Sequence, residues 1–147
     1  MKHTRLFLTA AAVLALDRLT KALWKDADAV LIPGVLALRG TRKTGMAFGW
    51  LSGGGWLLIP LTLALLAGVL IYVRRRQLNR LCQYGAGLLL GGALGNLLDR
   101  IFLGYVIDFI DPVFLHWFIF NLADAGICLG AALLMIHLIF GKEEKHP

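Results

Sequence analysis

The sequence has few of the residues that most often bind metals or cross-link a chain. It contains two cysteines, Cys82 and Cys128, which lie 46 positions apart in or beside separate apolar runs, and its four histidines are scattered. Neither cysteine has the spacing of a metal ligand, so we interpret both as packing residues. The composition therefore predicts no metal site, and nothing in the sequence requires a cofactor.

Nucleophile motifs and charged residues are also scarce. No serine or cysteine stands beside a base in a recognisable nucleophile arrangement. Charged residues make up 16% of the chain, against about 25% in typical soluble domains. The net charge of +6 comes from basic residues that cluster at the ends of apolar runs, which favours membrane association over nucleic-acid binding.

Apolar residues are abundant and make up 59% of the 147 residues. Four runs approach or reach the roughly 20 residues that span a bilayer. We expect these spans at 6–24, 56–73, 84–102 and 117–140. The predicted fold is a mainly α membrane protein, a four-helix transmembrane bundle that forms a single integral membrane domain over 1–147.

The first of these runs has a second interpretation. A basic start at Lys2 and Arg5, followed by apolar residues, also resembles a cleavable secretory signal peptide. However, the apolar character resumes after Arg18, and no small-residue cleavage site precedes a polar chain. We therefore expect a retained span, in which Asp17 and Lys21 share one helical face and form an ion pair.

The loop over 25–55 is long for so small a protein, which is typical of a functional loop. Residues 30–38 predict a turn followed by a strand. Residues 44–51 predict a tight glycine turn and a short amphipathic helix. In the third span, Gly87, Gly91 and Gly95 recur every four residues and predict close approach by another helix.

The lysines and arginines predict the orientation. The N-terminus, the segment 74–80 and the C-terminal tail carry two, four and two of them, whereas the loop 103–116 carries none. Basic residues in short segments favour the cytoplasmic side. We therefore expect both termini in the cytoplasm and the loops 25–55 and 103–116 outside.

Polar residues interrupt the third and fourth spans near their outer ends. An ionisable group at membrane depth costs roughly 2.5–3.5 kcal/mol, so such residues need a reason. One interpretation is a structural polar cluster that joins helices, and the other is a functional site. The convergence of several of them favours a site; they are Asn96, Asp99, Arg100, Asn121 and Asp124.

Two carboxyl groups held close together can share one proton, because both cannot ionise cheaply. The ionised partner then takes a proton from water while the protonated one polarises the scissile carbonyl. Asp108 and Asp124 are the best-placed pair, near the outer ends of the third and fourth spans. Asp99 is the competitor, but it adjoins Arg100 and is expected as a helix-end partner. Asp111 precedes a proline and is expected in a turn.

The sequence resembles lipoprotein signal peptidase, also called signal peptidase II, over nearly its whole length. The matching segments are Asp17-Arg18-Leu19-Thr20-Lys21, Thr44-Gly45-Met46-Ala47-Phe48-Gly49, Gly95-Asn96-Leu97-Leu98-Asp99-Arg100, Val106-Ile107-Asp108-Phe109 and Phe120-Asn121-Leu122-Ala123-Asp124. The resemblance implies a membrane-embedded aspartic endopeptidase. Such an enzyme removes signal peptides from diacylglyceryl-modified prolipoproteins by cutting before the lipidated cysteine.

The resemblance also implies roles for residues. Asp108 and Asp124 would be the catalytic pair. The residues that would bind substrate or shape the site are Asn96, Arg100, Asn121, Asp17, Lys21, Lys43, Gly45 and Phe48. The outer loop would form a small extracytoplasmic β-cradle and a surface helix that closes over substrate. The protein would be a monomer in the bacterial cytoplasmic membrane, in contact with lipids, with its site near the outer face.

Lys43 departs from the family pattern, which has asparagine two residues before the loop glycine. Arg18 likewise stands where glutamine is common. We expect the Lys43 ammonium to snorkel to lipid headgroups. The alternative is that it points toward the aspartates, where a cation lowers the pKa of nearby carboxyl groups.

Two other functions are weighed. One, suggested by the departure at Lys43, is a non-catalytic member of the family that binds lipoproteins without cutting them. The other is a small four-span transporter, which predicts a weakly biased topology and little outer loop, and this sequence fits neither expectation.

Overall fold

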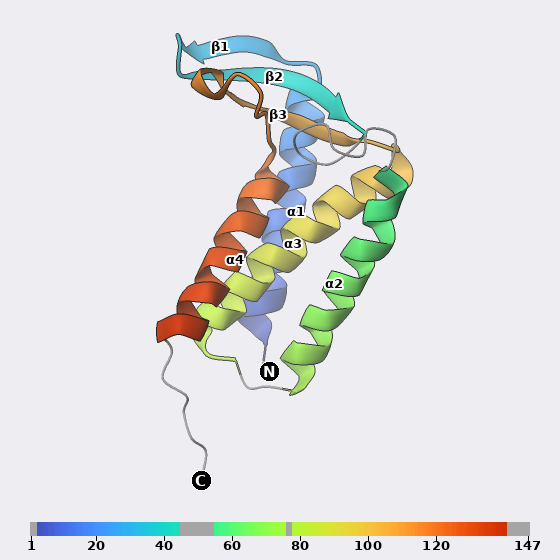
Figure 1. Ribbon diagram of the computed structural model, residues 1–147, viewed down its shortest axis with the longest axis vertical. Coiled ribbons are helices and arrows are strands. Elements are labelled where there is room, and N and C mark those ends of the chain that lie inside the picture. The colour runs from blue at the N-terminus through green and yellow to red at the C-terminus, as the bar shows by residue number, and fades with distance from the viewer. Residues whose placement is uncertain (1–2, 45–54, 76–77, 141–147) are drawn as a thin grey trace.

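The computed structural model describes residues 3–44, 55–75 and 78–140. The elements in chain order are α1 (Thr4–Trp24), β1 (Asp28–Ile32), β2 (Leu36–Lys43), α2 (Gly55–Arg75), α3 (Arg80–Phe102), β3 (Val106–Pro112), the 3-10 turn η2 (Val113–Leu115) and α4 (Leu122–Phe140). The four helices run side by side, and the three strands lie across one end of them (Figure 1). The start of α1 and the end of α4 lie at the opposite end.

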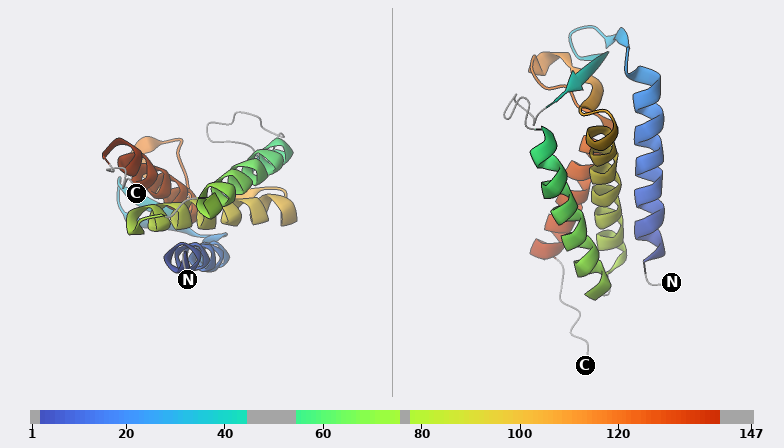
Figure 2. Two further views of the ribbon diagram at one scale, coloured as in Figure 1. Left: turned by 90° about the horizontal axis from the view of Figure 1, so that it is seen from below. Right: turned by 90° about the vertical axis from the view of Figure 1, so that its right-hand side faces the viewer.

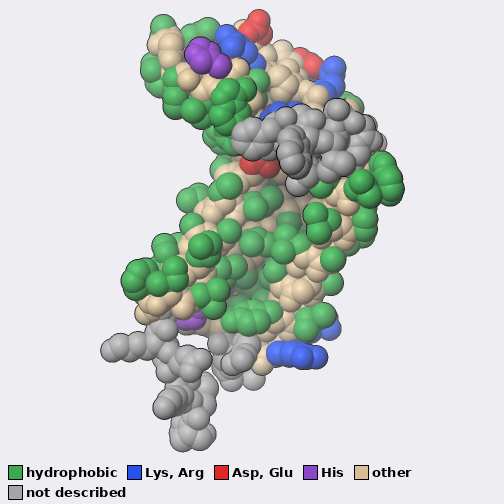
Figure 3. Space-filling model, viewed as in Figure 1, with side chains coloured by type: hydrophobic (Ala, Val, Ile, Leu, Met, Phe, Trp, Pro, Cys, Tyr) green, Lys and Arg blue, Asp and Glu red, His purple; other side chains and the backbone are tan. Residues whose placement is uncertain are grey.

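Three helices, α2, α3 and α4, are long and apolar enough to cross a membrane. The helix α1 is not among them, because Asp17, Arg18 and Lys21 place three charges in its last eight residues. Apolar side chains cover much of the helical surface in the space-filling view, which is rare in soluble proteins (Figure 3). The described chain therefore has four helices, and the fourth membrane span remains a prediction.

The central helix is α3, which packs against α1 on one side and against α2 and α4 on the other (Figure 2). Its close contact with α1 depends on the predicted glycine face. A Cβ atom at Gly91 would lie 2.6 Å from the backbone oxygen of Ala10, and one at Gly87 would lie 2.6 Å from that of Leu6. The prediction of a close helix contact is confirmed.

Apolar packing around α3 holds the helices together. Its buried residues form one cluster with residues of α1 and α2; the members are Leu6, Leu66, Val73, Ala86, Leu90, Ala93 and Leu97. On another face of α3, Gly92 lets α4 approach, since a Cβ there would lie 2.3 Å from the backbone oxygen of Ala123. The helix α3 is thus a rigid support for residues near its C-terminal end.

The sheet is antiparallel throughout, with the order β1-β2-β3. The predicted turn and strand over 30–38 are present as the end of a hairpin that turns at Gly34, whose φ is +73°. The expectation that 103–116 is only a loop, with Asp111 in a turn, is wrong. Asp111 lies in β3, because residues 106–112 pair with β2 as an antiparallel strand. The Asp111 carboxylate forms an ion pair with Arg39 of β2 at 2.7 Å.

Two helix boundaries also differ from expectation. The helix α4 begins at Leu122 and not at 117, because Phe120 pairs with Ile110 in the sheet and Asn121 accepts a hydrogen bond from the N–H of Asp124 (2.8 Å). The helix α3 begins at Arg80 and not at 84, because Asn79 caps it. The predicted surface helix, including Gly45 and Phe48, lies outside the described residues.

Candidate active site

Asp108 and Asp124 come from different elements and are joined through Asn121. Asp108 lies in β3, and Asp124 lies in the first turn of α4. The Nδ2 of Asn121 donates to Oδ1 of Asp108 at 2.7 Å, and its backbone N–H donates to Oδ2 of Asp124 at 3.3 Å. Asn121 is fully buried, so one immobilised residue holds both carboxyl groups.

A second amide, Asn96 of α3, completes this arrangement. Its Nδ2 donates to Oδ1 of Asp124 at 2.7 Å, and its Oδ1 accepts from Nδ2 of Asn121 at 3.0 Å. Both oxygens of Asp124 therefore accept hydrogen bonds from neutral groups.

Lys43 points toward the aspartates, and the prediction that it snorkels to headgroups is wrong. Its Nζ lies 2.7 Å from Oδ2 of Asp108 and also donates to the backbone oxygen of Ile119. The register of the sheet explains this direction, because Thr41 pairs with Asp108 and side chains alternate along a strand. Lys43 therefore shares a face with Thr41 and reaches Asp108 diagonally.

The surroundings of Asp108 raise the pKa of its carboxyl group from 3.8 to about 6. Burial is the largest cause, because it disfavours the charged form. The hydrogen bond from Lys43 opposes this effect, the nearby charge of Asp124 reinforces it, and the hydrogen bond from Asn121 opposes it. The Asp108 carboxyl can therefore exchange a proton near neutral pH.

A buried network of charges lies beneath this pair, between α1 and α3. The Nζ of Lys21 lies 2.9 Å from Asp17, 2.8 Å from Asp99 and 3.0 Å from Oδ1 of Asn96. The predicted Asp17–Lys21 pair is thus confirmed. All four side chains are buried, and removing one member would leave an uncompensated charge inside the protein.

Asp99 belongs to this network near the C-terminal end of α3, and its partners are cations of α1. Its carboxylate binds Lys21 and, at 2.7 Å, Arg18. Successive residues of a helix point about 100° apart, so Asp99 faces α1 while Arg100 faces elsewhere. Arg100 donates to the backbone oxygen of Asn96 at 3.2 Å and is within electrostatic range of Asp108 and Asp124.

The network also holds the backbone beside each aspartate of the pair. Asp17 accepts a hydrogen bond from the N–H of Ala123 (3.1 Å), which precedes Asp124. Asp99 accepts one from the N–H of Ile107 (3.3 Å), which precedes Asp108. The charges of α1 and α3 therefore fix the two backbone segments that carry the candidate pair.

The structure brings together eight of the ten residues predicted for the site, and Gly45 and Phe48 lie outside the described residues. Sequence reasoning missed the pairing of Arg18 with Asp17 and Asp99. The signal available in the sequence was Arg18 itself, because a third charge beside Asp17 and Lys21 in an apolar helix costs free energy unless it has a partner. Within the described ranges, no three His, Cys, Asp or Glu side chains group so that they could hold a metal ion.

Comparisons with known proteins agree on one family. The family model for Signal peptidase (SPase) II matches residues 9–140. The "Lipoprotein signal peptidase" of Geobacillus thermodenitrificans (strain NG80-2) is 41% identical over 142 residues, which cover 91% of this chain and 89% of the relative. That of Syntrophomonas wolfei subsp. wolfei is 42% identical over 140 residues, covering 90% and 92%.

A solved structure is also similar. It is a bacterial membrane enzyme determined by the in meso method at 2.3 Å resolution. It is 31% identical in sequence, covers 97% of this chain and 93% of its own, and has a TM-score of 0.85. The similarity therefore includes the helices and the sheet that carry the candidate site.

Proposed function

Because the chain belongs to the signal peptidase II family, we propose that it cleaves by an aspartic mechanism with Asp108 and Asp124 as the catalytic pair. The protein is a bacterial membrane protease that removes signal peptides from prolipoproteins. The observation that carries the proposal is the bridge through the fully buried Asn121, which hydrogen-bonds both carboxyl groups. Neither a transporter nor a non-catalytic binder is supported.

The proposed reaction needs one ionised and one protonated carboxyl group. Lys43 and Asn121 both donate to Asp108 and stabilise its ionised form, so Asp108 takes the proton from the attacking water. Asp124 holds the other proton and donates it toward the scissile carbonyl oxygen. The tetrahedral intermediate then collapses as the nitrogen of the leaving amine gains a proton from the pair, which titrates as a unit.

The other residues of the site support this pair. Asn96 and Asn121 orient the carboxyl groups. Asp17, paired with Lys21, accepts a hydrogen bond from the backbone N–H of Ala123 and so fixes the backbone beside Asp124. Arg100 and Lys43 supply positive charge beside the aspartates. We extend the proposal to Gly45 and Phe48 through the family resemblance of their motif.

The proposal also covers the substrate and the orientation. The cut falls before a diacylglyceryl-modified cysteine, and a single domain over residues 1–147 acts as a monomer among lipids. Both termini lie in the cytoplasm, so the sheet and the aspartates lie near the outer face. The charge distribution of the sequence supports this orientation.

The test is cleavage of a lipidated precursor peptide by Asp108→Asn and Asp124→Asn variants, in the presence of excess chelator. Each change removes one half of the pair and is expected to abolish cleavage, while asparagine, which is nearly isosteric, keeps the fold. Asp26→Asn is the matched control, because Asp26 is exposed and pairs, among the described residues, with Arg42 on the surface. It should cleave as the wild type does.

Folding of each variant is checked by thermal unfolding in detergent. Retention of a tenth or more of the wild-type kcat/KM by either variant would refute the assignment of the pair. Loss of wild-type cleavage in chelator, restored by zinc, would refute the metal-free mechanism.

A further inference from the structure

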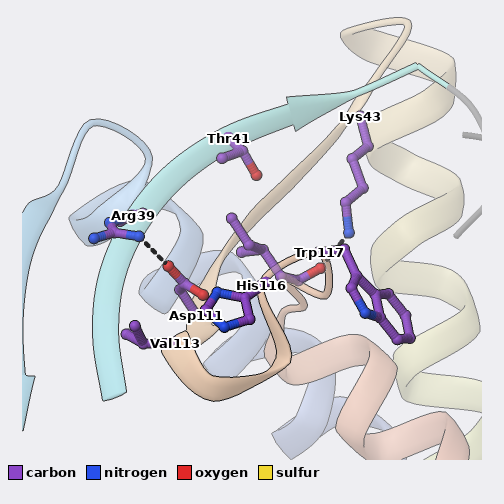
Figure 4. A pocket seen from close by; sticks show the side chains of 8 residues that line it. Arg39, Thr41, Lys43, Asp111, Val113, His116 and Trp117 are labelled. Carbon is purple, nitrogen blue, oxygen red and sulfur yellow. Dashed lines mark hydrogen bonds and ion pairs between the residues drawn. The ribbon is translucent and has the colours of Figure 1, made fainter. Parts of the chain in front are cut away.

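A pocket of about 290 Å³ opens beside the catalytic pair, between the sheet and the segment that follows β3 (Figure 4). Arg39, Thr41 and Lys43 of β2 line one side of it, and Asp111, His116 and Trp117 line the other. The reaction proposed above uses none of these residues except Lys43.

The pocket extends away from Asp108 along β2. Lys43 marks the near end, since its Nζ is 2.7 Å from Oδ2 of Asp108. Arg39 marks the far end, four residues back along the strand, which corresponds to about 13 Å at 3.3 Å per residue. An extended peptide covers that distance with about four residues.

The accessible charge in this pocket is positive. Arg39 and Asp111 form an ion pair at 2.7 Å, but the Asp111 side chain is 7% exposed and that of Arg39 is 47% exposed. The guanidinium therefore covers its partner carboxylate and still faces the pocket. Lys43 is 31% exposed and adds a second cation at the near end.

Two parts of a prolipoprotein must leave the cut in different directions. The apolar signal peptide matches the exposed apolar flanks of the helices, whereas the mature chain is polar and must leave the membrane. At the sheet end, where this pocket lies, charged and histidine side chains are exposed among the apolar ones (Figure 3). The mature chain therefore runs from Asp108 toward Arg39.

We propose that this pocket binds the first residues of the mature chain and favours acidic over basic side chains at the third and fourth positions after the cut. This inference rests on the proposed function, because it takes Asp108 as the point of cleavage. Arg39 is the specificity-determining residue at the far end of the pocket. The carboxylate of Asp111 partly neutralises the positive charge of its guanidinium.

The test compares two lipidated precursor peptides that differ only at those two positions, Asp-Asp in one and Lys-Lys in the other. The wild type should cleave the acidic peptide with a kcat/KM about three- to tenfold higher, the range for one or two partly exposed ion pairs. The ratio of the two values is the readout, because it is independent of how much enzyme is folded.

Two variants should move this ratio in opposite directions. Arg39→Gln removes the cation and leaves the Asp111 carboxylate unpaired, so the ratio should fall to about one or below. Asp111→Asn frees the guanidinium from its partner, so the ratio should rise above the wild-type value. A merely structural role would slow both peptides together and leave the ratio unchanged.

Arg42→Gln is the matched control. Arg42 lies on the same strand but on its other face, where it binds Asp26 at 3.4 Å, so the wild-type ratio should persist. Equal cleavage of both peptides by the wild type, or a ratio unmoved in both pocket variants, overturns the subsite and leaves the proposed function intact. Cleavage of neither peptide by the wild type overturns the proposed function itself.

Discussion

At the scale of single residues, Asn121 makes contacts that its acidic isostere would not. Its Nδ2 donates to Asn96 (3.0 Å), Ile107 (3.1 Å) and Asp108 (2.7 Å), while its Oδ1 accepts from the N–H of Asp124 (2.8 Å). An ionised aspartate offers acceptors only. The amide is therefore required at this position, because it must donate to a carboxylate and cap a helix at once.

Lys43 provides a test of how the pair titrates. The substitution Lys43→Asn removes the cation that lowers the pKa of Asp108, so this pKa should rise further above its wild-type value of about 6. Ionised Asp108 then forms only at higher pH. The acidic limb of the kcat/KM profile should move upward by about one pH unit, measured from pH 4 to 9.

The control is Lys43→Arg, which keeps the positive charge and should leave the acidic limb near its wild-type position. The other charges that act on Asp108 are those of Asp124 and Arg100, and neither variant changes them. An acidic limb that stays in place in Lys43→Asn would show that Lys43 does not act on the titration of the pair.

At the scale of elements, the glycines of α3 allow a prediction with an internal control. Gly91→Ala would place a methyl group 2.6 Å from the backbone oxygen of Ala10, and such overpacking costs about 1–3 kcal/mol. Gly68→Ala in α2 meets no described atom within 4 Å and should gain about 1 kcal/mol of helix propensity. The free energy of unfolding should fall in the first variant and rise in the second.

The measurement is thermal or denaturant unfolding of each variant in the same detergent. A Gly91→Ala protein as stable as Gly68→Ala would contradict the close packing of α1 on α3.

Elements defined by local pattern were predictable from the sequence. The long apolar runs located all four helices, and the turn near Gly34 located the strand β2 that follows it. The strand β3 was missed, because its pairing with β2 joins segments about 70 residues apart and leaves no local signal. The start of α4 was placed too early, because Trp117 and Phe118 are apolar enough to extend the run but pack as a loop.

The candidate site was predictable for residues that belong to a sequence motif and are also polar groups that cost free energy to bury in a membrane. Asp108, Asp124, Asn96 and Asn121 stood out as polar residues in apolar surroundings, and the structure joins them by hydrogen bonds. The direction of Lys43 was not predictable, because it follows from the register of β2 against β3. The Arg39–Asp111 pair depends on the same register, and no motif contains it.

At the scale of the whole molecule, the orientation across the membrane can be measured. In a variant with Cys82 and Cys128 replaced by alanine, a cysteine at position 114 should react with an impermeant thiol reagent from outside the cell. Phe114 is 61% exposed and lies at the sheet end. A cysteine at position 77, beside Arg74 and Arg75, should react only after the cytoplasm is opened.

Labelling of both positions from the same side would contradict the helical arrangement. Labelling of position 77 from outside and of position 114 only from inside would invert the orientation and place the aspartates at the cytoplasmic face.

The charges buried between α1 and α3 also bear on the order of events during synthesis. Lys21 and Asn96 lie 75 residues apart. At a synthesis rate of 5–20 residues per second, Asn96 is therefore synthesised about 4–15 s after Lys21. Until then, the charges at the end of α1 have only one another as partners, and each costs roughly 2.5–3.5 kcal/mol at membrane depth. We therefore expect the nascent α1 to remain at the headgroup layer while later helices insert. The first helix to leave the ribosome would be among the last to reach its final depth.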